Sequence, residues 1–171
     1  DNNALSNGKE FLLQKLEMSE NLQDLSLILT TLESLTKLMS SEKLRRCTRN
    51  LYLKRCENIT EVIIPYSCMK QMVNLERLEI RNCRNLKFMT VQKSINDYYT
   101  GFQNLHSVTI TDCSMIDMNW LVYVPNLESL HLQGCKLLKN VLCDDEIVWD
   151  YENYGKIFCK LRSVILFDLP E

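Results

Sequence analysis

The residues best suited to chemistry in this chain are its eight cysteines and two histidines. Cysteine thiolates and histidine imidazoles are common zinc ligands, and structural zinc sites usually draw them from closely spaced pairs. The chain contains no C-x-x-C pair, and neither His106 nor His131 stands at ligand spacing from paired cysteines. The sequence therefore predicts no metal site.

A nucleophile with a neighbouring base is the other chemistry that these residues could perform. His131 and Cys135 are four residues apart, but they fall on opposite sides of the strand pattern described below, so they cannot form such a pair. The acidic run 144–146 lacks the spacing of an EF-hand calcium site. Neither a phosphate-binding glycine loop nor a G-x-S-x-G or H-E-x-x-H motif occurs. We therefore expect no enzyme activity and no cofactor in this chain.

Four of the cysteines close copies of one sequence frame, L-x-x-L-x-L-x-x-C. The copies are "RNLYLKRC", "NLERLEIRNC", "NLHSVTITDC" and "NLESLHLQGC", and they end at Cys56, Cys83, Cys113 and Cys135. A fifth copy, over residues 160–169, has leucine in place of the cysteine, and a looser copy lies at 21–29. The first positions of successive copies are 22 to 34 residues apart, which is inside or close to the range of leucine-rich repeats.

The shared position of these cysteines predicts their chemical state. Free cysteine is among the most buried residue types, and stacked copies of the frame would place the four thiols in one column. We therefore expect reduced, structural thiols, which indicate a cytosolic setting and a cytoplasmic location.

The frame has the two-residue period of a β-strand. In the copy that ends at Cys83, Leu78 and Ile80 fall on one face, and the charged residues that alternate with them fall on the other. One short strand cannot bury its apolar face alone, whereas stacked copies can do so in a parallel sheet. We therefore expect Leu78, Val108 and Leu130 to lie side by side on adjacent parallel strands.

These observations predict an α/β fold, a leucine-rich repeat solenoid of about six irregular repeats. Short parallel strands would form its concave face, and helices and loops its convex face. The expected strands lie near 22–29, 48–56, 75–83, 105–113, 127–135 and 161–169. One domain would span residues 1–171 as a piece of a longer chain, and apolar spacing predicts amphipathic helices over 30–44 and 9–18.

Two connections, 87–103 and 139–160, are longer than a tight repeat needs, and long loops often carry function. Aromatic residues of the kind favoured at protein interfaces are concentrated in them, namely Tyr98, Tyr99, Trp149 and Tyr151. These side chains either contact a partner at the rim of the solenoid or pack over the rim itself.

Positive charge is concentrated in residues 43–93, which carry twelve Lys and Arg against four Asp and Glu in a chain of net charge −2. The expected concave-face positions hold Lys54, Arg55, Arg77 and Arg81, followed in later copies by Thr109, Asp112 and His131. A basic stripe of this kind suits an acidic protein surface or an acidic neighbouring domain. The chain is not basic overall and lacks a base-stacking module, so we expect no nucleic acid. No apolar run reaches the ~18 residues of a membrane span.

Longer stretches resemble one protein family. They are "LSLILTTLESLTKLMSSEKLRRCTRNLYLKRCENIT" (25–60), "MNWLVYVPNLESLHLQGCKLLKNVL" (118–142) and "FCKLRSVILFDLPE" (158–171). The W-L-x-x-x-P-N-L-E-x-L connection, the cysteine-ended strands and the closing D-L-P together resemble the C-terminal leucine-rich repeats of plant intracellular nucleotide-binding immune receptors of the coiled-coil class.

This resemblance implies a function. The repeats of such a receptor recognise a pathogen effector or a guarded host protein, and they restrain the receptor's nucleotide-binding domain. The partners expected for this chain are therefore a protein and that domain of its own receptor. ATP or ADP would be bound by the nucleotide-binding domain and by no residue of this chain.

Three alternatives remain open at the level of the sequence. Substrate-recognition repeats of an F-box type ubiquitin ligase also end in cysteine, although they are more regular in length than 22 to 34 residues. An enzyme or ligase domain would need a nucleophile exposed in a pocket. A purely structural spacer would tolerate any substitution on the concave face.

Overall fold

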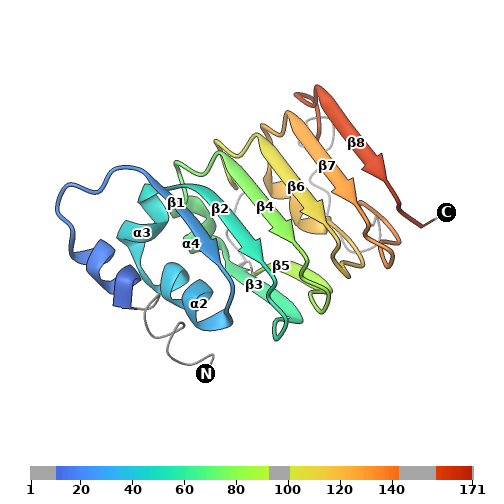
Figure 1. Ribbon diagram of the computed structural model, residues 1–171. Helices are drawn as coiled ribbons and strands as arrows, with labels where there is room; N and C mark the ends of the chain where they lie inside the picture. The colour runs from blue at the N-terminus through green and yellow to red at the C-terminus, as the bar shows by residue number, and fades with distance from the viewer. Residues whose placement is uncertain (1–10, 93–100, 143–156, 171) are drawn as a thin grey trace.

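The computed structural model describes residues 11–92, 101–142 and 157–170, and a six-stranded parallel sheet runs through it (Figure 1). Its strands are β1 (Leu25–Leu29), β2 (Thr48–Lys54), β4 (Arg77–Arg81), β6 (Ser107–Thr111), β7 (Ser129–Gln133) and β8 (Ser163–Phe167). They lie side by side in this order, so each strand pairs with the strand of the next sequence frame. The predicted α/β class with parallel strands is confirmed.

The strands pair without a shift from β2 to β8. Leu78 is opposite Val108, and Val108 is opposite Leu130, so the predicted neighbourhood of these three residues is confirmed. All three are buried. Each buried aliphatic side chain contributes roughly 1.5–3 kcal/mol to folding, and here its burial depends on the strands on either side.

Helices pack on the inward side of the sheet. They are α2 (Leu32–Ser40), α3 (Glu42–Cys47), α4 (Tyr66–Gln71), the 3-10 helix η1 (Asn119–Tyr123) and an unlabelled helix over 11–18. The prediction of a single helix over 30–44 was wrong, because two helices, α2 and α3, occupy this segment. Ser41 has extended backbone angles, and its hydroxyl accepts a hydrogen bond from the N–H of Leu44, so it ends α2 and caps α3. No helix in the described ranges is both long and apolar enough to cross a membrane.

A second sheet was missed at the sequence level. β3 (Glu61–Pro65) and β5 (Phe88–Gln92) form a two-stranded parallel sheet. β5 lies within 87–103, which was expected to be a long loop. Val62 and Met89 are paired in this sheet and buried in the core. Both strands are only five residues long and lack the repeated frame, so their sequences carried no comparable signal.

From β2 onward, every strand of the six-stranded sheet ends in the same left-handed turn. The turn residues have φ angles between 52° and 64°, and they are Arg55, Asn82, Asp112, Gly134 and Asp168. Left-handed backbone is unfavourable for most side chains, but hydrogen bonds hold it here. The N–H of Asn82, for example, donates to the carbonyl of Thr111 on the next strand at 2.9 Å. The turn carries the chain out of the sheet one residue before the cysteine of each frame.

The cysteine column joins each frame to the preceding one. The thiol of Cys83 donates to the carbonyl of Leu53 at 3.7 Å, and that of Cys113 donates to the carbonyl of Ile80 at 3.6 Å. Hydrogen bonding with the thiol of Cys83, followed by burial, raises the pKa of Cys56 and Cys113 above its usual range. Burial also raises the pKa of Cys135. The thiols of Cys56, Cys113 and Cys135 are therefore protonated, hydrogen-bonded parts of the core.

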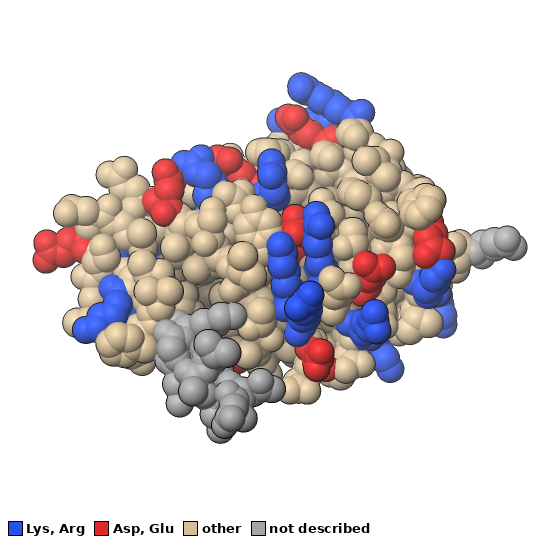
Figure 2. Space-filling view, viewed as in Figure 1, with Lys and Arg blue, Asp and Glu red and all other residues tan. Residues whose placement is uncertain are grey.

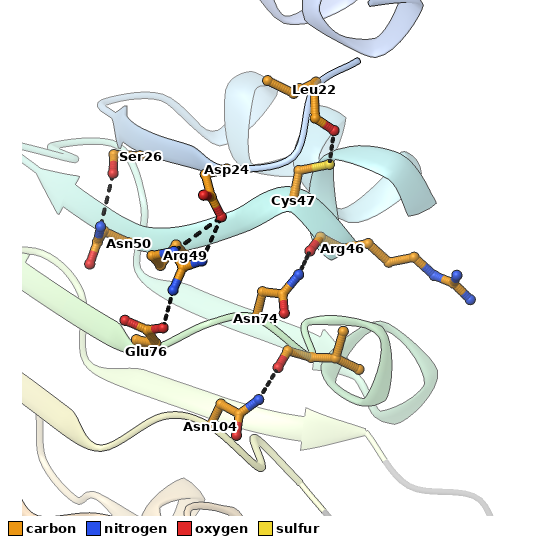
Figure 3. A network of polar contacts seen from close by, with 11 residues as sticks. Leu22, Asp24, Ser26, Arg46, Cys47, Arg49, Asn50, Asn74, Glu76 and Asn104 are labelled. Atoms are coloured by element: carbon orange, nitrogen blue, oxygen red, sulfur yellow. Dashed lines mark hydrogen bonds and ion pairs between the residues drawn. The ribbon is translucent and has the colours of Figure 1, made fainter. Parts of the chain in front are cut away.

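Asparagines form a second link between frames (Figure 3). The side-chain amide of Asn74 donates to the carbonyl of Arg46 at 2.7 Å, and that of Asn104 donates to the carbonyl of Val73 at 2.6 Å. Asn126 makes the equivalent bond to Gln103. The asparagine in "NLERL", "NLHSV" and "NLESL" thus has a structural role that the leucine pattern did not reveal.

Replacing Leu78 with aspartate should unfold the sheet beyond its own strand. An uncompensated carboxylate would be buried between β2 and β6, and we expect the free energy of unfolding to fall by at least about 3 kcal/mol. Urea denaturation followed by circular dichroism measures this loss. Arg77→Glu is the matched control, because it changes the adjacent residue on the exposed side of the same strand. Equal stability of the Leu78→Asp and control variants would contradict the packing described.

Removing one of the asparagine hydrogen bonds between frames should lower the free energy of unfolding by a smaller amount. Asn104→Ala leaves the carbonyl of Val73 without its donor, and we expect a loss of about 1 kcal/mol in the free energy of unfolding. Asn58→Ala, at an exposed asparagine in the loop after β2, should change stability by less than about 0.5 kcal/mol. Equal losses of stability for Asn58→Ala and Asn104→Ala would show that the Asn104 hydrogen bond makes no specific contribution to stability.

Thiol labelling should separate the buried cysteines from the exposed one. Among the described cysteines only Cys159 is exposed, so we expect a maleimide to modify it first in the folded chain. The column cysteines should react only after denaturation, because all four are buried and a raised pKa further depletes the thiolate of Cys56, Cys113 and Cys135. Mass spectrometry of the labelled peptides identifies each site. Fast modification of Cys83 or Cys113 in the folded chain would refute the assignment of a closed column.

Candidate functional site: the open face of the sheet

The outward side chains of the six-stranded sheet form what we call the open face. These side chains point away from the helices, and the strand register places them in rows. The middle row runs Ile28, Tyr52, Glu79, Thr109, His131 and Ile165. The flanking rows include Arg77, Ser107 and Ser129 on one side, and Lys54, Arg81, Gln133 and Phe167 on the other. This is the face on which the sequence predicted protein binding.

A buried carboxylate organises the charged part of the open face. The Glu79 residue is 9% exposed, and its Oε1 lies 3.2 Å from Lys54 Nζ and 2.7 Å from Arg81 Nε. Lys54 Nζ also lies 5.0 Å from the centre of the Tyr52 ring. A carboxylate this deeply buried needs partners of opposite charge. The ion pairs with Glu79 therefore fix the side chains of Lys54 and Arg81 against β2 and β4.

Glu79 was not among the predicted site residues, although a signal for it was present. It is the only acidic residue at the outward positions of the two basic frames, and parallel stacking had to bring it close to Lys54 and Arg81. Those two residues were predicted as exposed members of the basic stripe. Each is instead bound to Glu79, so the basic stripe is partly neutralised.

Two of the predicted cations make no ion pair with a described residue. Arg77 and Arg55 are exposed, and within the described ranges neither makes an ion pair. Arg77 lies on β4, and Arg55 occupies the left-handed turn after β2. Together with Lys54 and Arg81 they give four cations against the single carboxylate of Glu79. Figure 2 shows basic side chains gathered over β2 and β4 around an acidic one.

Other charges near this face are already balanced. Arg49 lies at the start of β2 between Asp24, at 2.7 Å, and Glu76 (Figure 3). Hydrogen bonding to Asp24 raises the pKa of Arg49. Asn50 donates to Ser26 at 2.9 Å in the same region. These contacts join β1, β2 and the residue before β4, and they leave Arg49 unavailable to a partner.

The remaining predicted residues of the face are uncharged or lie at its edge. Thr109 and His131 are half-buried neighbours on β6 and β7. Asp112 is exposed in the turn after β6. Its carboxylate lies so close to Gly134 that a Cβ at that glycine would be 2.5 Å from Asp112 Oδ1. A side chain at Gly134 would therefore require the exposed Asp112 side chain to move, whereas the equivalent turns accept Arg, Asn and Asp at a similar φ.

The aromatic residues predicted at the rim are Tyr98, Tyr99, Trp149 and Tyr151. They lie outside the described residues, so their role in binding stays a prediction.

Strand β8 gives the open face an apolar end. Four consecutive residues on it are exposed: Val164 at 49%, Ile165 at 49%, Leu166 at 56% and Phe167 at 63%. Ile165 and Phe167 belong to the open face, while Val164 and Leu166 continue the inward rows. "SVILF" was recognised as a strand, but the frame expects polar residues at the two outward positions.

No group of three or more His, Cys, Asp and Glu in the described ranges could hold a metal ion. His131 is on the open face, whereas Cys135 is completely buried. The two residues therefore lie on different sides of the sheet.

Comparison with known proteins identifies relatives of the chain. No protein-family model and no solved structure matches it. A probable disease resistance protein of Arabidopsis thaliana is 31% identical over 139 residues, which cover 76% of this chain and 15% of the relative. Disease resistance protein RPS5 of the same plant is 28% identical over 170 residues, covering 92% of this chain and 18% of the relative. Disease resistance protein UNI of the same plant is 26% identical over 175 residues, which cover 96% of this chain and 18% of the relative.

The alignments therefore extend over most of this chain but over less than a fifth of each of these relatives. The predicted family resemblance is confirmed: the chain is a homologue of the plant disease resistance proteins.

Proposed function

We propose that this chain is the leucine-rich repeat region of a plant immune receptor and that it recognises proteins through the open face. Its six strand-bearing frames would be irregular repeats of one solenoid. The partner would be a pathogen effector or a guarded host protein. The proposal assigns the chain no catalytic role and no cofactor, and it places the receptor in the cytoplasm.

The open face is the observation that carries this proposal. Six strands present side chains in aligned rows, and no helix of the described residues covers them (Figure 1). The rows change from strongly basic on β2 and β4 to neutral on β6 and β7, so the surface is chemically distinctive. Charge complementarity of this kind favours specific partners and fast association.

The basic part of the open face also supports a restraining contact within the receptor. An acidic surface of the nucleotide-binding domain could lie against Arg55, Arg77 and Arg81, and this contact would hold the receptor inactive until a partner competes for it. ATP or ADP would belong to that domain.

Charge reversal tests the proposal. We expect Arg55→Glu, Arg77→Glu and Arg81→Glu together to reduce co-precipitation of this chain with the nucleotide-binding domain of its receptor at least tenfold, a change of about 1.4 kcal/mol. In leaves, the same changes in the full receptor should cause cell death without a pathogen, because the restraint is lost.

Arg46→Glu is the matched control, since it reverses an exposed arginine on helix α3. It should leave co-precipitation and cell death unchanged, and circular dichroism should show both variants folded. Unchanged co-precipitation by the triple variant would reject the restraining contact through this face.

A further inference from the structure

The open face is divided into two chemically different ends, and this division points to the kind of segment it binds. Strands β2 and β4 and the turn after β2 carry a charged cluster, which consists of Lys54, Arg55, Arg77, Glu79 and Arg81. The outward positions of β6 and β7 hold hydroxyl, amide and imidazole side chains, with no Lys, Arg, Asp or Glu among them. Figure 2 shows an uncharged surface over the middle of these two strands. β8 then contributes the exposed side chains of Ile165 and Phe167.

The charged end is suited to carboxylates. Arg55 and Arg77 have no acidic partner among the described residues, and Glu79 is already bound by two cations. The cluster therefore retains three positive charges. Glu79 fixes the positions of Lys54 and Arg81, so little side-chain freedom is lost when an anion binds beside them.

The apolar end is suited to a large aliphatic or aromatic side chain. The Phe167 residue is 63% exposed and Ile165 is 49% exposed, and removing such surface from water contributes roughly 25 cal/mol per Å². A partner residue that covers both would bind more tightly than one that contacts only the uncharged strands between.

Strand spacing sets the distance between the two ends. Neighbouring strands lie about 4.8 Å apart, so the three steps from β4 to β8 span about 14 Å and the four steps from β2 to β8 about 19 Å. An extended peptide rises about 3.3 Å per residue. The two ends are therefore about four to six residues apart along such a peptide.

We propose that the open face binds an extended acidic segment that crosses the strands, with its carboxylates on the charged cluster around Lys54, Arg55 and Arg81 and a large apolar side chain on Ile165 and Phe167. Arg77, at the other end of β4, adds positive charge to the same cluster. This inference rests on the proposed function, because it names the chemistry of the partner of the same face. Thr109 and His131 lie beneath the middle of the segment and contact its backbone or small side chains.

A peptide-binding measurement tests the proposal with the full 171-residue chain. The probe is a dye-labelled peptide with aspartates at one end, leucine at the other and a spacer of about four serines. Fluorescence anisotropy reports its affinity. We expect Arg55→Glu with Arg77→Glu to weaken binding at least tenfold, and Phe167→Ser to weaken it about threefold. Arg46→Glu should have no effect.

Matched peptides test the two ends separately. Replacing the aspartates with lysines should abolish binding, and removing the spacer should weaken it as strongly as Phe167→Ser. A peptide with serine in place of leucine should bind equally well to the parent chain and to the Phe167→Ser variant, because the contact that the variant removes is already absent.

Four outcomes would overturn the inference. They are undetectable binding of the probe, equal binding by the Arg55→Glu, Arg77→Glu variant, no dependence on the spacer, and tighter binding of a uridine oligonucleotide that carries the same charge as the probe. Any of these results is distinguishable from failure of the proposed function, because co-precipitation with a folded protein partner is measured independently of this probe.

Discussion

Each strand of the six-stranded sheet has an aliphatic side that only its neighbours can bury. Leu78 depends on the residues opposite it, Leu51 and Val108, and the same relation repeats from β2 to β7. Parallel pairing without a shift is the arrangement that keeps these rows aligned, since a shift of one residue would turn every aliphatic side chain outward. The positions of all other features, including the charged cluster, follow from this alignment.

Polar links keep the frames aligned at both ends of the strands. Asparagine amides bond to the preceding frame where the strands begin, and cysteine thiols do so where they end. Between the strand and the cysteine, the left-handed turn donates its N–H to the following strand. The thiol bonds lie in the buried core, whereas the asparagine bonds are exposed to solvent. The turn keeps nearly the same φ whether Arg, Asn, Asp or Gly occupies it.

The same alignment decides which charges can act on a partner. Lys54, Glu79 and Arg81 come together because β2 and β4 are adjacent, and the result is a fixed cluster rather than three independent side chains. Arg49 is neutralised by acids of the frames on either side. Arg55 and Arg77 retain unpaired charge among the described residues. The chemical character of the open face is therefore a property of neighbouring frames and not of any single frame.

The sequence by itself determined the repeated strands, their parallel order and the inward position of the aliphatic residues and cysteines. It could do so because the two-residue period and the recurring frame are local patterns that only stacking can satisfy. The tertiary structure alone decided the β3–β5 sheet, the break at Ser41, the asparagine links and the pairing of Glu79. These features depend on contacts between residues more than twenty positions apart or on the geometry of one backbone turn, and neither leaves a periodic signal in the chain.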